Sequence, residues 1–170
     1  MTEESKSRWE GETSVELHGI TAEQVWPLLE DFCNIHKWMP IETCYQVEGV
    51  TGQPGLIRYC ATTTRDDGDP LIKWAKEKLL MIDPIQHCLI YEVVDSNMGF
   101  KSYVATLKLL PVTIVSGDKP KPTSCKIQWS FACDPVDGWT FDGLFSYIQF
   151  VLQFMAKKME LACSHQDKSL

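Results

Sequence analysis

Apolar and polar residues alternate along much of the chain, and this period of two predicts strands that bury one face. The segment Cys125–Cys133 is the clearest example, because Lys126, Gln128 and Ser130 separate its apolar residues. The segment from Ser116 to Pro122 is predicted to be a loop, because proline cannot donate a backbone hydrogen bond to a sheet. Comparable alternating runs, divided by turn residues, predict further strands at Trp9–Leu17, Cys44–Glu48, Leu56–Thr64, Ile72–Asp83, Cys88–Asp95 and Lys101–Leu110.

Two regions have the residue spacing of helices. Thr21 and Gln24 form a predicted capping box at the start of the first region, where we expect two short helices that end by Pro40. The second region, from Thr140 to Cys163, predicts the longest helix, and residues 165–170 are expected to form a frayed tail. The apolar stripe of the long helix consists of Phe141, Leu144, Phe145, Ile148, Leu152, Met155 and Met159.

The order of these elements predicts an α+β fold in a single domain, residues 1–170, with its ordered core at about 9–163. We expect a seven-stranded curved antiparallel sheet around a long C-terminal helix, with two short helices after the first strand. One face of the sheet would be solvated and the other covered by the long helix. Such an arrangement leaves a cavity between sheet and helix, and apolar cavities with a few polar groups are common ligand sites.

Composition narrows the classes of function. The net charge of −7 argues against a nucleic-acid partner, because phosphate binding needs a basic face. The chain has no apolar run long enough for stable membrane insertion and no apolar signal-peptide core near Met1, so we expect a cytoplasmic protein. The seven cysteines include no C-x-x-C pair, and His18, His36, His87 and His165 lack metal-ligand spacing. We therefore expect free thiols, no metal and no cofactor.

One carboxylate stands on the apolar side of a predicted strand. Glu77 shares its face with Ala75 and Leu79, whereas its neighbour Lys76 points the other way. A carboxylate that faces an apolar interior is costly unless it is hydrogen-bonded, paired or protonated. A functional acid and a structural ion pair both fit this pattern, and Glu77 alone does not decide between them.

Two polar residues on other strands could meet Glu77. Tyr103 shares a face with Ala105 and Leu107, so it is expected to face inward, as a core ring or as a site residue. Strand parity leaves the direction of Arg58 open, but an inward Arg58 beside Glu77 would let both be buried as a pair. The three groups could move a proton, with Glu77 as the acid–base group, or could anchor a polar group of a ligand.

Six short stretches of the chain resemble a known family: Gln24-Val-Trp26, Val47-Glu-Gly49, Arg58-Tyr59, Trp74-Ala-Lys-Glu-Lys-Leu79, Tyr103 with Ala105-Thr106, and Trp129-Ser-Phe131. From Trp9 to Cys163 the chain resembles the Bet v 1 and START-like superfamily, also called the polyketide cyclase/dehydrase and lipid transport superfamily. Within it, the chain is most similar to the plant lachrymatory-factor-synthase-like group. The resemblance implies the helix-grip fold.

The resemblance also implies catalytic roles for Arg58, Glu77 and Tyr103. The synthases of that group convert an unsaturated sulfenic acid to a thial S-oxide, which is a proton shift without a cofactor. Lys73 and Val151 depart from these synthases, which carry an aromatic residue and a tryptophan at the positions that align, so the resemblance implies a different substrate here. The expected ligand contacts are Tyr91, Leu79, Leu89, Trp129, Phe131, Ile148, Val151, Leu152 and Met155.

Two functions therefore stay open. The first is a carrier or receptor that binds a small hydrophobic plant metabolite in an internal cavity. The alternative is a cofactor-free, lachrymatory-factor-synthase-like isomerase or cyclase that uses Glu77 as a proton shuttle with Arg58 and Tyr103. Reception of abscisic acid is disfavoured, because the Ser-Gly-Leu-Pro-Ala gate of those receptors is absent from the sequence. Nothing in the sequence identifies a protein partner.

Overall fold

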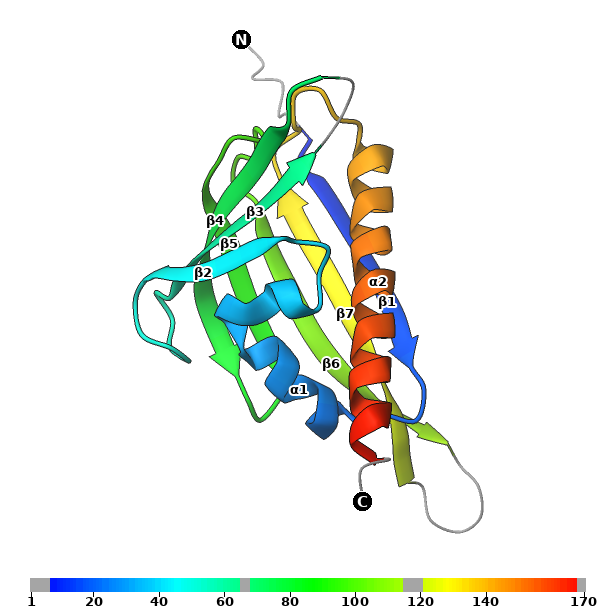
Figure 1. The fold of residues 1–170 in the computed structure, drawn as a ribbon. Coiled ribbons are helices and arrows are strands. Elements are labelled where there is room, and N and C mark those ends of the chain that lie inside the picture. Colours follow the sequence, from blue (N-terminus) through cyan, green and yellow to red (C-terminus); the bar gives the residue numbers. More distant parts are fainter. Residues whose placement is uncertain (1–6, 65–67, 115–120, 168–170) are drawn as a thin grey trace.

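A seven-stranded antiparallel sheet curves around one long C-terminal helix in the computed structural model, which describes residues 7–64, 68–114 and 121–167 (Figure 1). The strands are β1 (Trp9–Leu17), β2 (Thr43–Glu48), β3 (Ile57–Thr64), β4 (Leu71–Asp83), β5 (Cys88–Ser96), β6 (Val104–Ile114) and β7 (Lys121–Cys133). The helices are α1 (Ala22–Glu30), the short 3-10 helix η1 (Phe32–Lys37) and α2 (Phe141–Asp167).

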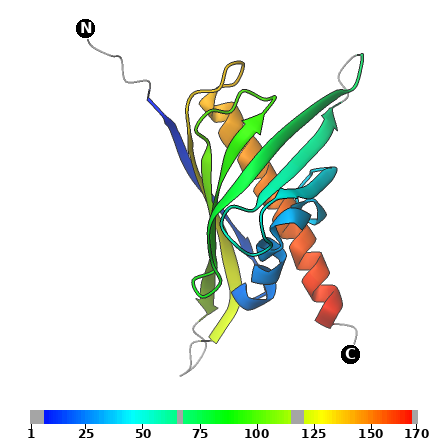
Figure 2. The ribbon, with the colours of Figure 1, turned by 90° about the vertical axis from the view of Figure 1, so that its left-hand side faces the viewer.

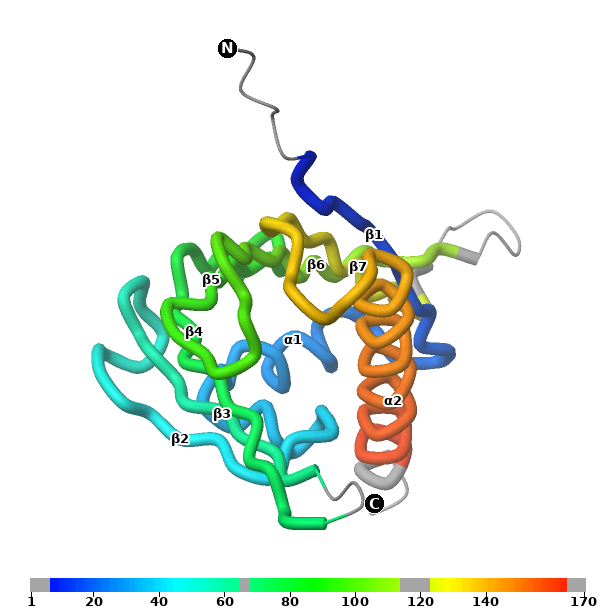
Figure 3. The backbone as a smooth tube through the Cα atoms, turned by 90° about the horizontal axis from the view of Figure 1, so that it is seen from above, coloured from blue at the N-terminus to red at the C-terminus, as the bar shows by residue number. Residues whose placement is uncertain are grey.

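The strand order is β1-β7-β6-β5-β4-β3-β2, so strands β2 to β7 neighbour each other in chain order and β1 joins the far edge beside β7. Seen from above, the strands form an arc, with α2 at one end of it and α1 inside (Figure 3). The view from the side shows α2 running along the concave side of the sheet (Figure 2). These observations confirm the predicted α+β helix-grip architecture.

Local sequence accounts for the first helix. Thr21 is the N-cap of α1, and its side chain accepts a hydrogen bond from the backbone N–H of Gln24, whose own side chain accepts one from Thr21 N–H. This reciprocal pair satisfies two donors that a helix start otherwise leaves free. Val25 and Leu29 lie on the inner side of α1 and are buried.

A glycine in β1 allows the sheet to pack closely. A Cβ atom at Gly11 would lie 2.7 Å from Cε1 of Phe131 and 3.0 Å from Cδ2 of Phe145. Phe131 lies on β7 directly opposite Gly11, and its ring covers the space that a side chain would occupy. The absence of a side chain at Gly11 therefore brings the β7 aromatic ring against both β1 and α2.

Two strands begin three or more residues from the predicted start, and β6 also ends at Ile114 rather than Leu110. β6 begins at Val104 rather than Lys101, because Ser102 has φ = 54°, which interrupts the extended backbone. β7 begins at Lys121, so placing Pro122 in a loop was wrong. The pairing of β1 with β7 ends at Cys125, so at Pro122 the strand has β6 as its neighbour and the missing N–H can face an unpaired side. Residues 116–120 lie outside the described part of the chain.

The long helix α2 supplies much of the core. Its buried positions include Leu144, Ile148, Leu152, Met155 and Met159, which belong to the predicted stripe. The helix extends to Asp167, so residues 165–167 are helical rather than a frayed tail, and residues 168–170 lie outside the described chain. Neither α2 nor any other described helix combines the length and the apolar character needed to cross a membrane.

Candidate functional site

A cavity of about 350 Å³ lies between the concave side of the sheet and α2. Strands β3, β4, β5 and β7 contribute to its wall, and so do α2 and the segment that follows η1. Most of the lining is apolar or aromatic. The polar groups of the inner wall include the carboxylate of Glu77, the thiol of Cys60 and the phenols of Tyr91 and Tyr103.

Arg58 and Glu77 form a buried ion pair at the wall of this cavity. The two residues are directly opposite each other on β3 and β4, and Nε of Arg58 donates a hydrogen bond of 2.8 Å to Oε1 of Glu77. The Arg58 side chain is only 2% exposed and the Glu77 side chain 15% exposed. The carboxylate lines the cavity, whereas the guanidinium lies behind it and is not part of the lining.

The guanidinium of Arg58 is held on several sides. Nη1 donates a hydrogen bond of 2.9 Å to the backbone carbonyl of Phe32, at the start of η1. Its central carbon lies 3.7 Å from the ring centroid of Phe32 and 4.9 Å from that of Tyr91, so both rings stabilise the cation. Burial opposes the charged form, but the neighbouring groups, Glu77 first among them, outweigh it and raise the pKa of Arg58. Arg58 is thus a fixed cation that orients the Glu77 carboxylate.

Two phenols lie near this carboxylate. Tyr103 is 5% exposed and stacks on Phe131, with ring centroids 6.1 Å apart, and its ring lies 6.4 Å from that of Tyr91. Burial raises the pKa of both Tyr91 and Tyr103 above the usual phenol range. Both phenols therefore stay protonated at neutral pH and can donate hydrogen bonds to a ligand oxygen.

Trp129 brings an indole N–H donor to the cavity. Its side chain is 5% exposed and lines the cavity. The indole N–H has no acceptor at good hydrogen-bond geometry, although it lies close enough to the Tyr103 hydroxyl to oppose the rise that burial causes in the pKa of that phenol. A buried N–H with only a weak hydrogen bond is costly, so an acceptor atom of a bound molecule would satisfy it better. The cavity thus offers a ligand the indole N–H as well as the two phenol hydroxyls.

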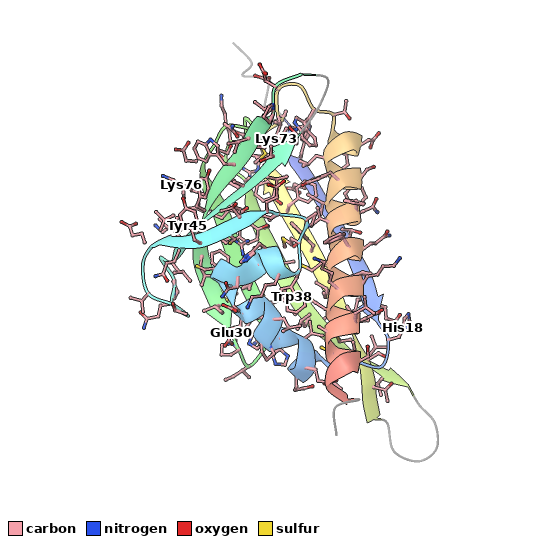
Figure 4. The ribbon with its side chains drawn as sticks, in the orientation of Figure 1. His18, Glu30, Trp38, Tyr45, Lys73 and Lys76 are labelled. Atoms are coloured by element: carbon pink, nitrogen blue, oxygen red, sulfur yellow. The ribbon has the colours of Figure 1, made fainter. Side chains whose placement is uncertain are left out.

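The entrance is formed by parts of the chain that are far apart in sequence. Thr64 and Lys73, from the two strands of the β3–β4 hairpin, line the cavity together with Tyr147 and Phe150 of α2. Tyr147 is 47% exposed and Phe150 57% exposed, so this part of the cavity is open to solvent. Lys73 lies at the upper end of the sheet, whereas Lys76 of the same strand points away from α2 (Figure 4). The middle of this hairpin, residues 65–67, lies outside the described chain.

The structure brings six of the residues predicted for the site to the cavity wall: Glu77, Tyr91, Tyr103, Trp129, Ile148 and Val151. Arg58 lies behind Glu77, to which it is paired, and is not part of the lining. The other five predicted ligand contacts are buried in the core and are not part of the lining: Leu79, Leu89, Phe131, Leu152 and Met155. Strand parity and the apolar stripe of α2 identify the inward-facing residues but do not distinguish the cavity from the packed core beside it.

Sequence reasoning missed the residues that loops contribute. Met98 and Phe100, between β5 and β6, line the cavity, as do Trp139, just before α2, and the segment Met39–Ile41 after η1. Large apolar residues in loops, such as Phe100 and Trp139, were the available signal. Periodicity could not show which way they point.

A second hollow, of about 490 Å³, lies on the β1, β6 and β7 part of the sheet. Its lining includes Glu10, Glu12, Thr106 and Ser130, and it has no buried ion pair. The cavity beside α2 combines enclosure, apolar walls and a fixed carboxylate, so it is the stronger candidate site.

Solved structures share this fold. XoxI from Bacillus cereus superposes with a TM-score of 0.64 at 20% identity, covering 90% of this chain and 94% of that one. A Thermobifida fusca protein gives 0.66 at 22% identity, over 88% and 92% of the two chains. Major latex-like protein 151 from ginseng, Panax ginseng, gives 0.60 at 20% identity, over 91% and 97%. At these identities the likeness concerns the fold alone.

The sequence itself gives the family. Residues 8–160 match the family described as polyketide cyclase / dehydrase and lipid transport. This match spans nearly all of the described chain and agrees with the curved seven-stranded sheet around α2. The protein therefore belongs to the polyketide cyclase / dehydrase and lipid transport family.

Proposed function

We propose that the protein binds a small, largely apolar plant metabolite that carries an oxygen acceptor, in the cavity between the sheet and α2. The observation that carries this proposal is the enclosed apolar cavity with the fixed carboxylate of Glu77 in its wall. Apolar walls supply affinity, and a few well-placed polar groups supply orientation.

Cavity size limits the class of ligand. A volume of about 350 Å³ is near the lower end of the range of about 300–1,000 Å³ for small-molecule sites. A compact metabolite fits such a space, whereas a lipid with two long chains does not. The ligand acceptor would receive hydrogen bonds from Tyr103 and from the Trp129 indole, which are both buried and at the wall.

Two lining residues support a ligand different from that of the lachrymatory-factor synthases. Lys73 and Val151, where the sequence departs from those enzymes, both line the cavity. Val151 makes room where a tryptophan would fill space, and Lys73 places a cation near the entrance. The ligand is therefore expected to differ in shape or charge from a small sulfenic acid.

Binding is tested with a fluorescent apolar probe and its displacement by a library of small metabolites. Val151→Trp should fill the cavity and abolish probe binding, whereas Gln153→Trp, on the exposed side of α2, should leave it unchanged. Both variants add the same indole to the same helix, so general effects of a new tryptophan cancel. The proposal fails if no member of the library shows saturable binding, or if both variants bind like the wild type.

The second candidate is an isomerase or cyclase in which Glu77 moves a proton. It is favoured by one specific observation: the carboxylate lines the cavity while Arg58, behind it, fixes its position at 2.8 Å. Tyr103 would hold the developing oxyanion, and a positioned acid–base group contributes about 10²–10⁴-fold to a rate.

Freshly generated alkenyl sulfenic acid, with detection of the thial S-oxide, tests the narrowest form of this enzyme hypothesis. Glu77→Gln should abolish turnover and keep most of the probe affinity, because the amide preserves the shape of the side chain. Wild-type turnover that survives in Glu77→Gln would rule out the assigned role. Failure of the wild type on this substrate would exclude the sulfenic-acid reaction.

A further inference from the structure

A pair of cysteines lies at the edge of the site and has no role in the function proposed above. Cys44 on β2 and Cys60 on β3 are directly opposite each other in the antiparallel ladder. Their sulfur atoms are 3.5 Å apart, and both are thiols. Cys60 lines the cavity and its sulfur lies 3.8 Å from Oε1 of Glu77, so the pair adjoins the anionic wall of the cavity.

The backbone geometry suits a disulfide between these two residues. Directly opposite residues of an antiparallel pair have Cα atoms about 4.5 or 5.5 Å apart. Both spacings fall within the range of about 4.4–6.8 Å that disulfides require. Since the two side chains already point at each other, the sulfur atoms can meet by rotation about the side-chain bonds, without a shift in strand register.

We propose that Cys44 and Cys60 form an oxidation site that reacts with low-molecular-weight disulfides and closes to an intramolecular disulfide. β2 is an edge strand, and Cys44 is partly exposed on it. Cys60 is 6% exposed. Cys44 is therefore the residue that an external disulfide can reach, and Cys60 is the residue that resolves the intermediate.

The chemistry balances as two thiol–disulfide exchanges. The Cys44 thiolate attacks one sulfur of the small disulfide; a Cys44–sulfur bond forms, the small disulfide bond breaks, and one small thiolate leaves and takes up a proton. Cys60 then loses its proton, and its sulfur attacks the Cys44 sulfur and displaces the second small thiolate, which is also protonated. Cys44 and Cys60 are together oxidised by two electrons, and the small disulfide is reduced to two thiols.

The electrostatic surroundings also favour Cys44 as the attacking residue and Cys60 as the resolving residue. The hydrogen bond from Cys60 is the largest cause that lowers the pKa of Cys44, to about 6, and the charge of Arg58 adds to it. The hydrogen bond to Cys44 and burial raise the pKa of Cys60. A thiolate is the attacking form in exchange, so the exposed sulfur is the one prepared to react.

Tryptic cleavage allows a direct test, because Cys44 and Cys60 fall in separate peptides, 38–58 and 59–65, that hold no other cysteine. The folded, reduced full-length chain is equilibrated in glutathione buffers of increasing oxidised fraction. Free thiols are then blocked with N-ethylmaleimide at acid pH, and the peptides are identified by mass. We expect the linked peptide pair 38–58/59–65 to accumulate as the oxidised fraction rises, with the loss of two hydrogens.

Three variants check the assigned roles. Cys60→Ala should lose the link and retain glutathione on Cys44, because nothing resolves the mixed disulfide. Cys44→Ala should lose both the link and the glutathione adduct. Cys33→Ala is the matched control: Cys33 interacts electrostatically with Cys44 but lies on η1, in peptide 9–37, and its removal should leave the link intact.

Each other outcome overturns the proposal. A link between peptides 9–37 and 38–58 would make Cys33 the partner of Cys44. Stable glutathione on wild-type Cys44 would show that Cys60 does not resolve it. A wild-type chain that stays fully reduced in oxidised glutathione until it is unfolded would show that the pair is not an oxidation site. The wild-type measurement needs no substitution, so it decides the matter even if a variant does not fold.

Discussion

Replacing Arg58 by methionine should destabilise the protein because it leaves a carboxylate in the wall of the cavity without its cation. Removing one partner of a buried ion pair typically costs about 3–5 kcal/mol in the free energy of unfolding. The lost contacts are the 2.8 Å bond to Glu77 and the 2.9 Å bond to the Phe32 carbonyl. The Glu77 side chain is 15% exposed and adjoins the cavity, where water can reach it, so we expect a loss of about 3 kcal/mol.

The reverse change should cost more. Glu77→Met leaves the guanidinium of Arg58 at 2% exposure without its carboxylate, so a loss of about 5 kcal/mol is expected. In the double variant both charges are gone, and what is lost is mainly the donor to the Phe32 carbonyl, about 1–3 kcal/mol. The double variant should therefore be more stable than Glu77→Met and no less stable than Arg58→Met.

Urea unfolding of the wild type, both single variants and the double variant, followed by tryptophan fluorescence in reducing buffer, gives the coupling energy. The exposed pair of Arg8 and Asp134, 3.9 Å apart with both side chains 44% exposed, is a control in the same chain, and its cycle should show little coupling. If the costs of Arg58→Met and Glu77→Met add to within about 0.5 kcal/mol, the two side chains do not act as a buried pair. The cavity would then lack the fixed carboxylate on which the proposed function depends.

Three further outcomes are expected. Gly11→Ala should destabilise the chain by about 1–3 kcal/mol in urea unfolding, because the new Cβ would lie 2.7 Å from the Phe131 ring; unchanged stability would show that the ring moves aside freely. Trp129→Phe should weaken binding of metabolites with an oxygen acceptor and leave a purely apolar probe unaffected, whereas equal losses for both would point to shape alone. Alkylation of Cys44 by iodoacetamide should rise with pH and be half-maximal near pH 6, since the thiolate reacts and the pKa of Cys44 is lowered to about 6; Cys60→Ala should move this midpoint upward, and an unmoved midpoint would contradict the assigned cause.

The order of elements in the fold could be predicted from the sequence because alternation and capping are local signals. The strand Cys125–Cys133 and the capping box of Thr21 and Gln24 gave the correct element types on this basis. The boundaries of the strands were harder to predict from the sequence. The left-handed backbone at Ser102 leaves no periodic signal in the sequence. The place of Pro122 depends on which strands are neighbours, and a single segment does not show this.

The candidate site was predictable where a charge conflicted with its surroundings. Glu77 stood out because a carboxylate shares a face with apolar residues, and the structure pairs it with Arg58, whose direction parity had left open. The buried N–H of Trp129, which lacks good hydrogen-bond geometry, and the opposition of Cys44 and Cys60 could not be foreseen in the same way. Both follow from strand register and from packing around the cavity.

The place of β1 in the sheet has a consequence for how the chain folds during synthesis. Strands β2 to β7 each pair with a strand adjacent in sequence, so hairpins can form as they leave the ribosome. β1 is synthesised before the other strands, yet its neighbour in the sheet is β7. Trp9 can therefore pair with Cys133 only after β7 has been synthesised. Contacts of such large sequence separation form slowly, because a long loop must close before they stabilise anything. We therefore expect the first strand to be the last to dock, and its apolar side to need protection from aggregation until β7 and α2 have emerged.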